Sequence, residues 1–186
     1  MLDLSGPNPW RTITSSVVFD DGRLRVREDA VVQPDGAPGT YSYVEGRWPV
    51  VAAVPLTHDG QVHLVRQWRY PWRRNSWEIP AGHCQPDEDP LHAAQRELAE
   101  EVGLQAARWQ LLHQGFGSAT VSTRIWLYLA RDLAPAPAGH AREGSEADMV
   151  TRAVPLAQAV AAATDGTIVH PYTIIGLLHV ARLTGS

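Results

Sequence analysis

Residues 82–104 read GHCQPDEDPLHAAQRELAEEVGL and place four glutamates and one arginine at fixed offsets. The stretch opens as a polar loop and continues as a helix. Asp89 followed by Pro90 predicts the helix start, because aspartate accepts hydrogen bonds from the first turn and proline needs no donor there. Gly103 predicts the end of the helix. We therefore expect a helix over 90–102.

The predicted helix has an apolar arc and an adjoining charged arc. At about 100° per residue, the side chains that share the core-facing arc are Leu91, Ala94, Leu98 and Val102. The adjoining arc holds Arg96, Glu97, Glu100 and Glu101. Carboxylates this close repel one another, and a hard divalent cation removes that penalty. For the pair Glu100 and Glu101 alone, the alternative is a solvated acidic face.

The sequence predicts an ion pair between the loop before the helix and the helix itself. Arg96 can bind Glu100 one turn ahead and can also reach back to Glu88 as a bidentate pair. Gly82 would let the backbone turn tightly, so that the carbonyl of Ala81 points at a metal ion.

Gly82, Glu88 and the run Arg96-Glu97-Leu98-x-Glu100-Glu101-x-Gly103-Leu104 together resemble the signature box of the Nudix hydrolases. This resemblance implies hydrolysis of nucleoside diphosphates linked to another moiety, on an α/β/α sandwich with a mixed sheet. The metal ligands that it implies are Ala81, Glu97, Glu100 and Glu101, and the last three are also the catalytic residues. Gly82, Glu88 and Arg96 would form a structural lock. Mg²⁺ is the expected metal, with Mn²⁺ as a substitute.

A narrower resemblance extends upstream of the box. Residues 66–70 (RQWRY) and 77–82 (WEIPAG) are similar to the ADP-ribose pyrophosphatase branch. The branch cleaves ADP-ribose or a related nucleoside diphosphate sugar to a nucleoside monophosphate and a sugar phosphate. The substrate-binding residues that it implies are Arg66, Trp68, Arg69 and Glu78. The N-terminal strands also resemble those that this branch exchanges between subunits, which implies a homodimer.

Two departures from that branch leave alternatives open. No proline lies between Pro90 and Pro135, where the branch usually carries one, and residues 102–131 contain neither Asp nor Glu. A catalytic carboxylate outside the box is therefore expected before the last strand, where the candidates are Glu146 first, then Glu143 and Asp148. The alternative substrates are GDP-mannose, NADH and dinucleoside polyphosphates. A Nudix module that senses a nucleotide without cleaving it is the other alternative.

Apolar and β-branched segments predict strands on both sides of the helix. They lie at 14–19, 24–32, 40–45, 49–56, 62–68, 77–79, 109–113, 124–130 and 149–154. The first three should form a small antiparallel extension, 1–47, before a hydrolase domain over 48–186. Two further helices are expected at 156–163 and 171–183, and loops at 115–123 and 134–145. The fold class expected is α/β, with a mixed sheet covered on both faces.

The bulk composition narrows the function classes. The chain has 186 residues, 44% of them hydrophobic, and a formal net charge of −4, which argues against a nucleic-acid binder relying on positive charge. A single cysteine excludes an intrachain disulfide and suits a reducing compartment. The first ten residues lack the features of a signal peptide, and no apolar run could span a bilayer. We expect a cytoplasmic protein whose partner is a small nucleotide, without nucleic-acid or membrane binding.

Overall fold

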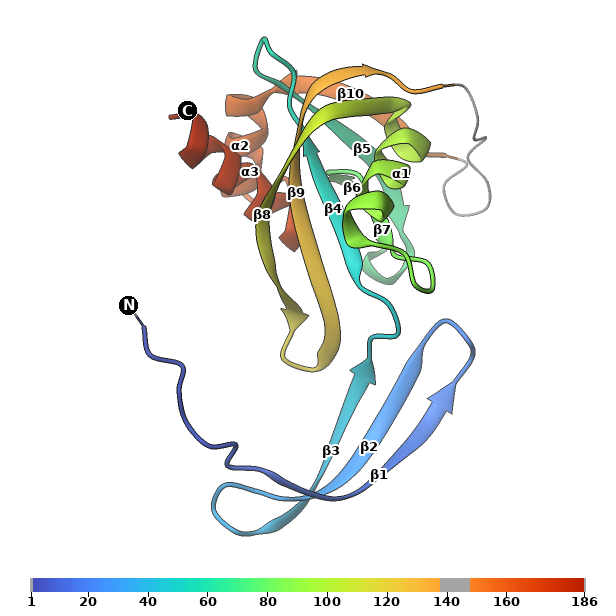
Figure 1. Ribbon diagram of the computed structural model, residues 1–186, viewed down its shortest axis with the longest axis vertical. Coiled ribbons are helices and arrows are strands. Elements are labelled where there is room, and N and C mark those ends of the chain that lie inside the picture. Colours follow the sequence, from blue (N-terminus) through green and yellow to red (C-terminus); the bar gives the residue numbers. More distant parts are fainter. Residues whose placement is uncertain (1, 138–147, 186) are drawn as a thin grey trace. The chain divides into compact units, whose positions relative to one another are not determined.

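The structure is a computed structural model that describes residues 2–137 and 148–185, and it divides into two compact units (Figure 1). Unit 1 comprises Met1–Arg47 and Ser118–Thr123, and unit 2 comprises Trp48–Gly117 and Arg124–Ser186. Within the described residues, no helix has both the length and the apolar character needed to cross a membrane.

Unit 1 is an antiparallel meander, as the sequence predicts. Its strands are β1 (Arg11–Asp20), β2 (Arg25–Val32) and β3 (Pro38–Glu45), each paired with the next in the chain. The first hairpin turns at Gly22, whose φ of 89° is readily adopted only by glycine. At the far edge, Val44 of β3 pairs in parallel with Val121. All ten residues of β1 are exposed.

Unit 2 is built around β4 (Val50–Pro55). This strand pairs in parallel with β9 (Val121–Pro135) and antiparallel with β7 (Ala81–His83), while β8 (Leu104–Ser118) pairs with β9. A second, antiparallel sheet places β5 (Gln61–Arg69) between β10 (Val150–Pro155) and β6 (Arg74–Glu78). A 3₁₀ turn, η1 (Tyr70–Trp72), joins β5 to β6.

Helices cover both faces of the β4 sheet. Figure 1 shows α1 (Pro90–Val102) on one side and α2 (Leu156–Thr164) with α3 (Pro171–Thr184) on the other. Val51 packs in the α1 cluster and Val54 in the α2–α3 cluster, and both are fully buried. Alternate side chains of β4 thus enter two different cores, which explains its continuous apolar sequence. The predicted α/β/α arrangement with a mixed sheet is confirmed.

One predicted loop is wrong. Residues 115–123 were expected to be irregular, yet β8 continues to Ser118 and β9 begins at Val121, so only Ala119 and Thr120 form the turn. The small polar residues there favour turns locally, but pairing along a long hairpin keeps them extended. In the other predicted loop, 134–145, residues 134 and 135 belong to β9 and 138–145 lie outside the described residues.

Candidate active site

The acidic helix α1 begins and ends where the sequence predicts. Asp89 Oδ1 accepts hydrogen bonds from the backbone N–H of Leu91 at 2.9 Å and of His92 at 3.3 Å. At the other end, Gly103 has a φ of 74° and donates its N–H to the carbonyl of Ala99 at 3.0 Å. Both ends of α1 are therefore determined by residues within one turn.

Two of the acids on α1 are buried. Leu98 and Ala94 face the core as predicted, with Leu91 and Val102 half-buried at the ends of their arc. Glu97 is only 9% exposed and Glu101 only 2%, whereas Glu100 is half-buried. The solvated acidic face is thus ruled out for Glu101. Burying carboxylates is costly unless they are bonded or bind a cation.

Arg96 organises the acids around it. Its Nε and Nη2 donate to the two oxygens of Glu88, each at 3.0 Å, which is the bidentate pair expected from the sequence. Its Nη1 donates to Glu97 Oε1 at 2.7 Å and to Glu100 Oε2 at 3.0 Å. Nη2 also donates to the carbonyl of His83 at 3.0 Å. One guanidinium therefore joins the loop, β7 and α1.

This contact also sets the protonation of the pair. The hydrogen bonds from Arg96 hold the pKa of Glu88 below its ordinary value, although burial opposes this, and the N–H of Gln85 adds to the lowering. Glu88 in turn raises the pKa of Arg96, with Glu97 and Glu100 contributing. Both groups stay charged over the neutral range, so the loop stays fixed to the helix.

Gly82 supplies room for the carboxylate of Glu97. The sequence suggested a tight turn, but Gly82 lies inside β7 and is not among the glycines with positive φ, so that expectation is wrong. A Cβ at this position would stand 2.1 Å from Glu97 Oε1. Next to it, the N–H of Ala81 donates to Glu101 Oε2 at 3.0 Å. The short strand β7 thus packs directly against two carboxylates.

The donor set suits a hard divalent cation. Glu97, Glu100 and Glu101 offer only oxygen atoms, which are the ligands that Mg²⁺ prefers. In residues 2–137 and 148–185, no three His, Cys, Asp or Glu side chains already converge on one metal position. Mg²⁺ commonly completes its octahedron with waters and substrate phosphates rather than with a protein cage. The chemistry of the carboxylates fits the metal, and the ligand role of the Ala81 carbonyl stays a prediction.

The predicted substrate-binding residues Arg69 and Glu78 form a pair with each other. Arg69 Nε donates to Glu78 Oε1 at 2.8 Å and its Nη2 binds the second oxygen. Glu78 is fully buried, whereas a third of the Arg69 side chain is exposed. Glu78 therefore fixes the plane of the guanidinium. Contact of either residue with substrate stays a prediction.

Two residues that were not predicted from the sequence, His170 and Thr173, lie next to the Arg69–Glu78 pair. His170 Nε2 lies 3.5 Å from Glu78 Oε2, and its Nδ1 lies 2.9 Å from Thr173 Oγ1, which also accepts the N–H of Ile79 at 3.0 Å. Thr173 is fully buried and His170 is 7% exposed. Burial holds the pKa of His170 below its ordinary value; Glu78 opposes this shift and Arg69 adds to it. The available signal was a threonine next to the apolar run 174–178 in the first half of α3.

The other predicted residues are more dispersed. Trp68 is 46% exposed, and Arg66 is exposed with its guanidinium 5.9 Å from the centre of the Trp77 ring. Glu146 and Glu143 lie outside the described residues, while Asp148 is described and exposed. A catalytic role for Glu146 stays a prediction.

Comparison with known proteins identifies the family. The NUDIX domain matches residues 46–174, and the nucleoside diphosphate sugar hydrolase N-terminal domain matches residues 10–44. The chain is 34% identical over 179 residues to an ADP-ribose pyrophosphatase from Mycobacterium tuberculosis (strain ATCC 25618 / H37Rv), covering 94% of this chain and 84% of that protein. It is 30% identical to a methanol dehydrogenase activator from Bacillus methanolicus, over 66% of each chain.

A solved structure has the same fold. The crystal structure of an ADP compounds hydrolase aligns with a TM-score of 0.83 and 21% identity, and the alignment covers 97% of each chain. The chain therefore belongs to the NUDIX family and is a Nudix hydrolase, as the box at 82–104 indicates.

Proposed function

We propose that this protein is a Mg²⁺-dependent pyrophosphatase that cleaves ADP-ribose or a related nucleoside diphosphate sugar. The products are a nucleoside monophosphate and a sugar phosphate. The observation that carries the proposal is the acidic face of α1, with Glu97 and Glu101 buried and Arg96 bonded to Glu88, Glu97 and Glu100. The ADP-ribose pyrophosphatase among the relatives, and the match of residues 10–44 to a nucleoside diphosphate sugar hydrolase domain, support the substrate class.

The proposed metal ligands are the carboxylates of Glu97, Glu100 and Glu101 with the Ala81 carbonyl. Mg²⁺ is the proposed metal, and Mn²⁺ would serve as a substitute for it. When bound, the metal neutralises charge on the phosphate oxygens and makes phosphorus easier to attack. The N–H of Ala81 and the guanidinium of Arg96 hold these carboxylates in place before substrate arrives. Fixed positions of this kind lower the cost of reaching the transition state.

The carboxylates also accept the proton of the attacking water in this proposal. Glu101, Glu100 and Glu97 are the catalytic candidates within the box, and Glu146 is the candidate outside it. Arg69, held by Glu78, would bind phosphate oxygens, because a planar guanidinium matches them in geometry. Trp68 and Arg66, both exposed, would contact the rest of the nucleotide.

We further propose that residues 1–47 are a dimer-forming extension to the hydrolase domain 48–186, and that the protein is a cytoplasmic homodimer. Four large apolar side chains of β1 are exposed to solvent: Ile13 at 52%, Val17 at 46%, Val18 at 55% and Phe19 at 49% exposure. Exposed apolar strands of this kind favour association with another chain. Light scattering that gives a monomer at micromolar concentration would remove the homodimer. The cytoplasmic assignment rests on the one cysteine, Cys84, a free and buried thiol.

The variant Glu101→Gln tests the catalytic assignment. The amide keeps the size of the side chain but weakens metal ligation and proton transfer, so kcat should fall by at least about a hundredfold while the unfolding midpoint changes little. Glu28→Gln is the matched control, because Glu28 is exposed on β2 of unit 1. Near-normal turnover of Glu101→Gln with Mg²⁺ would refute the assignment.

A substrate panel tests the specificity. Values of kcat/KM for ADP-ribose, GDP-mannose, NADH and a dinucleoside polyphosphate should rank ADP-ribose or another nucleoside diphosphate sugar first. Preference for NADH or the dinucleoside polyphosphate would contradict the nucleoside diphosphate sugar class, while a preference for GDP-mannose would move the assignment away from ADP-ribose.

A further inference from the structure

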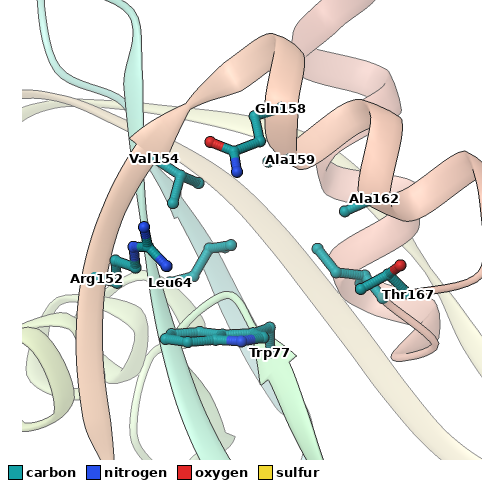
Figure 2. Close-up of a pocket in the computed structure, with 9 residues that line it drawn as sticks. Leu64, Trp77, Arg152, Val154, Gln158, Ala159, Ala162 and Thr167 are labelled. Atoms are coloured by element: carbon teal, nitrogen blue, oxygen red, sulfur yellow. The ribbon is translucent and has the colours of Figure 1, made fainter.

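A cavity of about 150 Å³ lies between α2 and the sheet formed by β10, β5 and β6 (Figure 2). Its walls include Leu64 of β5, Trp77 of β6 and the alanines Ala159 and Ala162 of α2. The cavity exists because α2 turns alanines toward the sheet, where larger side chains would fill the space between helix and strands. None of these residues is a proposed metal ligand or substrate-binding residue, although the guanidinium of Arg66 lies 5.9 Å from the centre of the Trp77 ring.

The cavity is apolar inside and polar at its rim. The pocket is half-open to solvent, but Leu64 is 3% exposed and Ala159 1% exposed, so its inner wall is hydrocarbon surface. Figure 2 shows the Trp77 ring at one end, Gln158 of α2 at the other, and the Arg152 side chain between them on the β10 side. An aromatic wall favours a planar ring, because stacked rings gain contact beyond simple burial.

Arg152 gives the pocket a preference for anionic ligands. In the part of the chain that the structure describes, no hydrogen bond or ion pair joins its guanidinium to another side chain. A guanidinium binds a carboxylate through two parallel hydrogen bonds. At the rim of an apolar cavity, it would select a ligand with a hydrophobic body and an anionic end.

The size of the cavity limits the ligand to one ring. An apolar protein cavity of this volume binds benzene, so the walls of this pocket have room for one phenyl ring and would leave most of a purine nucleotide outside. A nucleobase would also leave most of its polar edge without partners among leucine and alanine side chains. We propose that this cavity is a second ligand site, separate from the α1 site, that binds small aromatic carboxylates, with the ring against Trp77 and the carboxylate on Arg152.

Benzoate is the probe that tests this proposal. It should bind the full-length protein with a dissociation constant of about 1 mM, as expected for a ligand of this size. Ligand-observed NMR would compare it with benzyl alcohol, which keeps the ring but lacks the charge. Benzoate should bind about tenfold more tightly than the alcohol, because only benzoate makes the charged contact with Arg152.

Two variants locate the ligand. Ala162→Leu fills the cavity and should abolish binding, whereas Ala161→Leu adds the same volume at an exposed position of α2 and should leave binding unchanged. Arg152→Gln should weaken benzoate about tenfold and leave benzyl alcohol unaffected. Thermal unfolding of each variant verifies that it is folded, and Arg152→Gln tests the site even if Ala162→Leu is unstable.

Other outcomes overturn the proposal. Benzoate that fails to bind at tens of millimolar, or that binds Ala162→Leu as well as the native protein, would show that the cavity is not its site. Displacement of benzoate by AMP would place it in the nucleotide site instead. Equal affinity for benzoate and benzyl alcohol would remove the anionic preference.

Discussion

Replacing Gly82 with alanine should lower the catalytic rate, because the added Cβ would displace the carboxylate of Glu97. The new Cβ would stand 2.1 Å from Glu97 Oε1 and 2.2 Å from Glu97 Cδ, whereas ordinary contact begins at 3.4 Å. The carboxylate must therefore move by the difference, about 1.3 Å. That movement breaks or bends its 2.7 Å contact with Arg96. A displacement of about 1 Å in a positioned group costs about a hundredfold in rate.

The effect on stability should be smaller than the effect on rate. The atoms in the way belong to the end of a side chain rather than to the backbone, so Glu97 can turn aside at a cost near the low end of overpacking, about 1 kcal/mol. The assay is kcat and KM for the preferred substrate of the panel at saturating Mg²⁺, beside the free energy of unfolding in urea. We expect kcat to fall about a hundredfold.

Gly103→Ala is the matched control. Gly103 has a φ of 74° and open space around it, so alanine there strains the backbone by about 1 kcal/mol without touching an acid. Its activity per folded molecule should stay close to the native value. Native kcat for Gly82→Ala, or an equal loss of activity for Gly103→Ala at equal stability, would refute this role of Gly82.

Three further changes test the contacts around the site. Arg96→Lys keeps the charge but loses the planar fork, so the free energy of unfolding in urea should fall by about 1–2 kcal/mol; no change would show that the bidentate pair with Glu88 contributes little. Thr173→Val leaves the buried N–H of Ile79 without its acceptor and should cost about 1–3 kcal/mol in the same assay, whereas Thr173→Ser should stay near native. In the folded protein the pKa of His170 lies below 6.5, so as the pH falls below 6.5 the imidazole is protonated first in the unfolded chain. The free energy of unfolding should therefore decrease with falling pH until the folded pKa is reached. Urea unfolding across that range should show a shallower drop for His170→Asn, and an unchanged slope would contradict the shifted pKa.

Local sequence was sufficient for α1 and for the class of reaction. The helix ends depend on Asp89 and Gly103, whose partners lie within four residues, so they could be read without a fold. The box from Gly82 to Leu104 predicted the Nudix family for the same reason: its spacing lies within one continuous segment. The pairing of Arg96 with Glu88 also spans only eight residues.

The environment of those acids depended on strands far from the helix. The burial of Glu97 and Glu101 requires β7 to lie against α1, and the need for glycine at 82 follows from that packing rather than from a turn. The hairpin at 115–123 was missed because strand pairing outweighs the turn preference of small polar residues.

Two features of this protein were decided only by the tertiary structure. Thr173 meets the backbone of Ile79 across 94 residues of sequence, and His170 reaches Glu78 through the same approach of α3 to β6. The cavity beside Arg152 likewise exists because alanines of α2 meet β5 and β6. Sequence spacing determines what neighbouring residues can do within a helix or turn. Which distant side chains share a buried site depends on the packing of whole elements, since packing alone removes them from water.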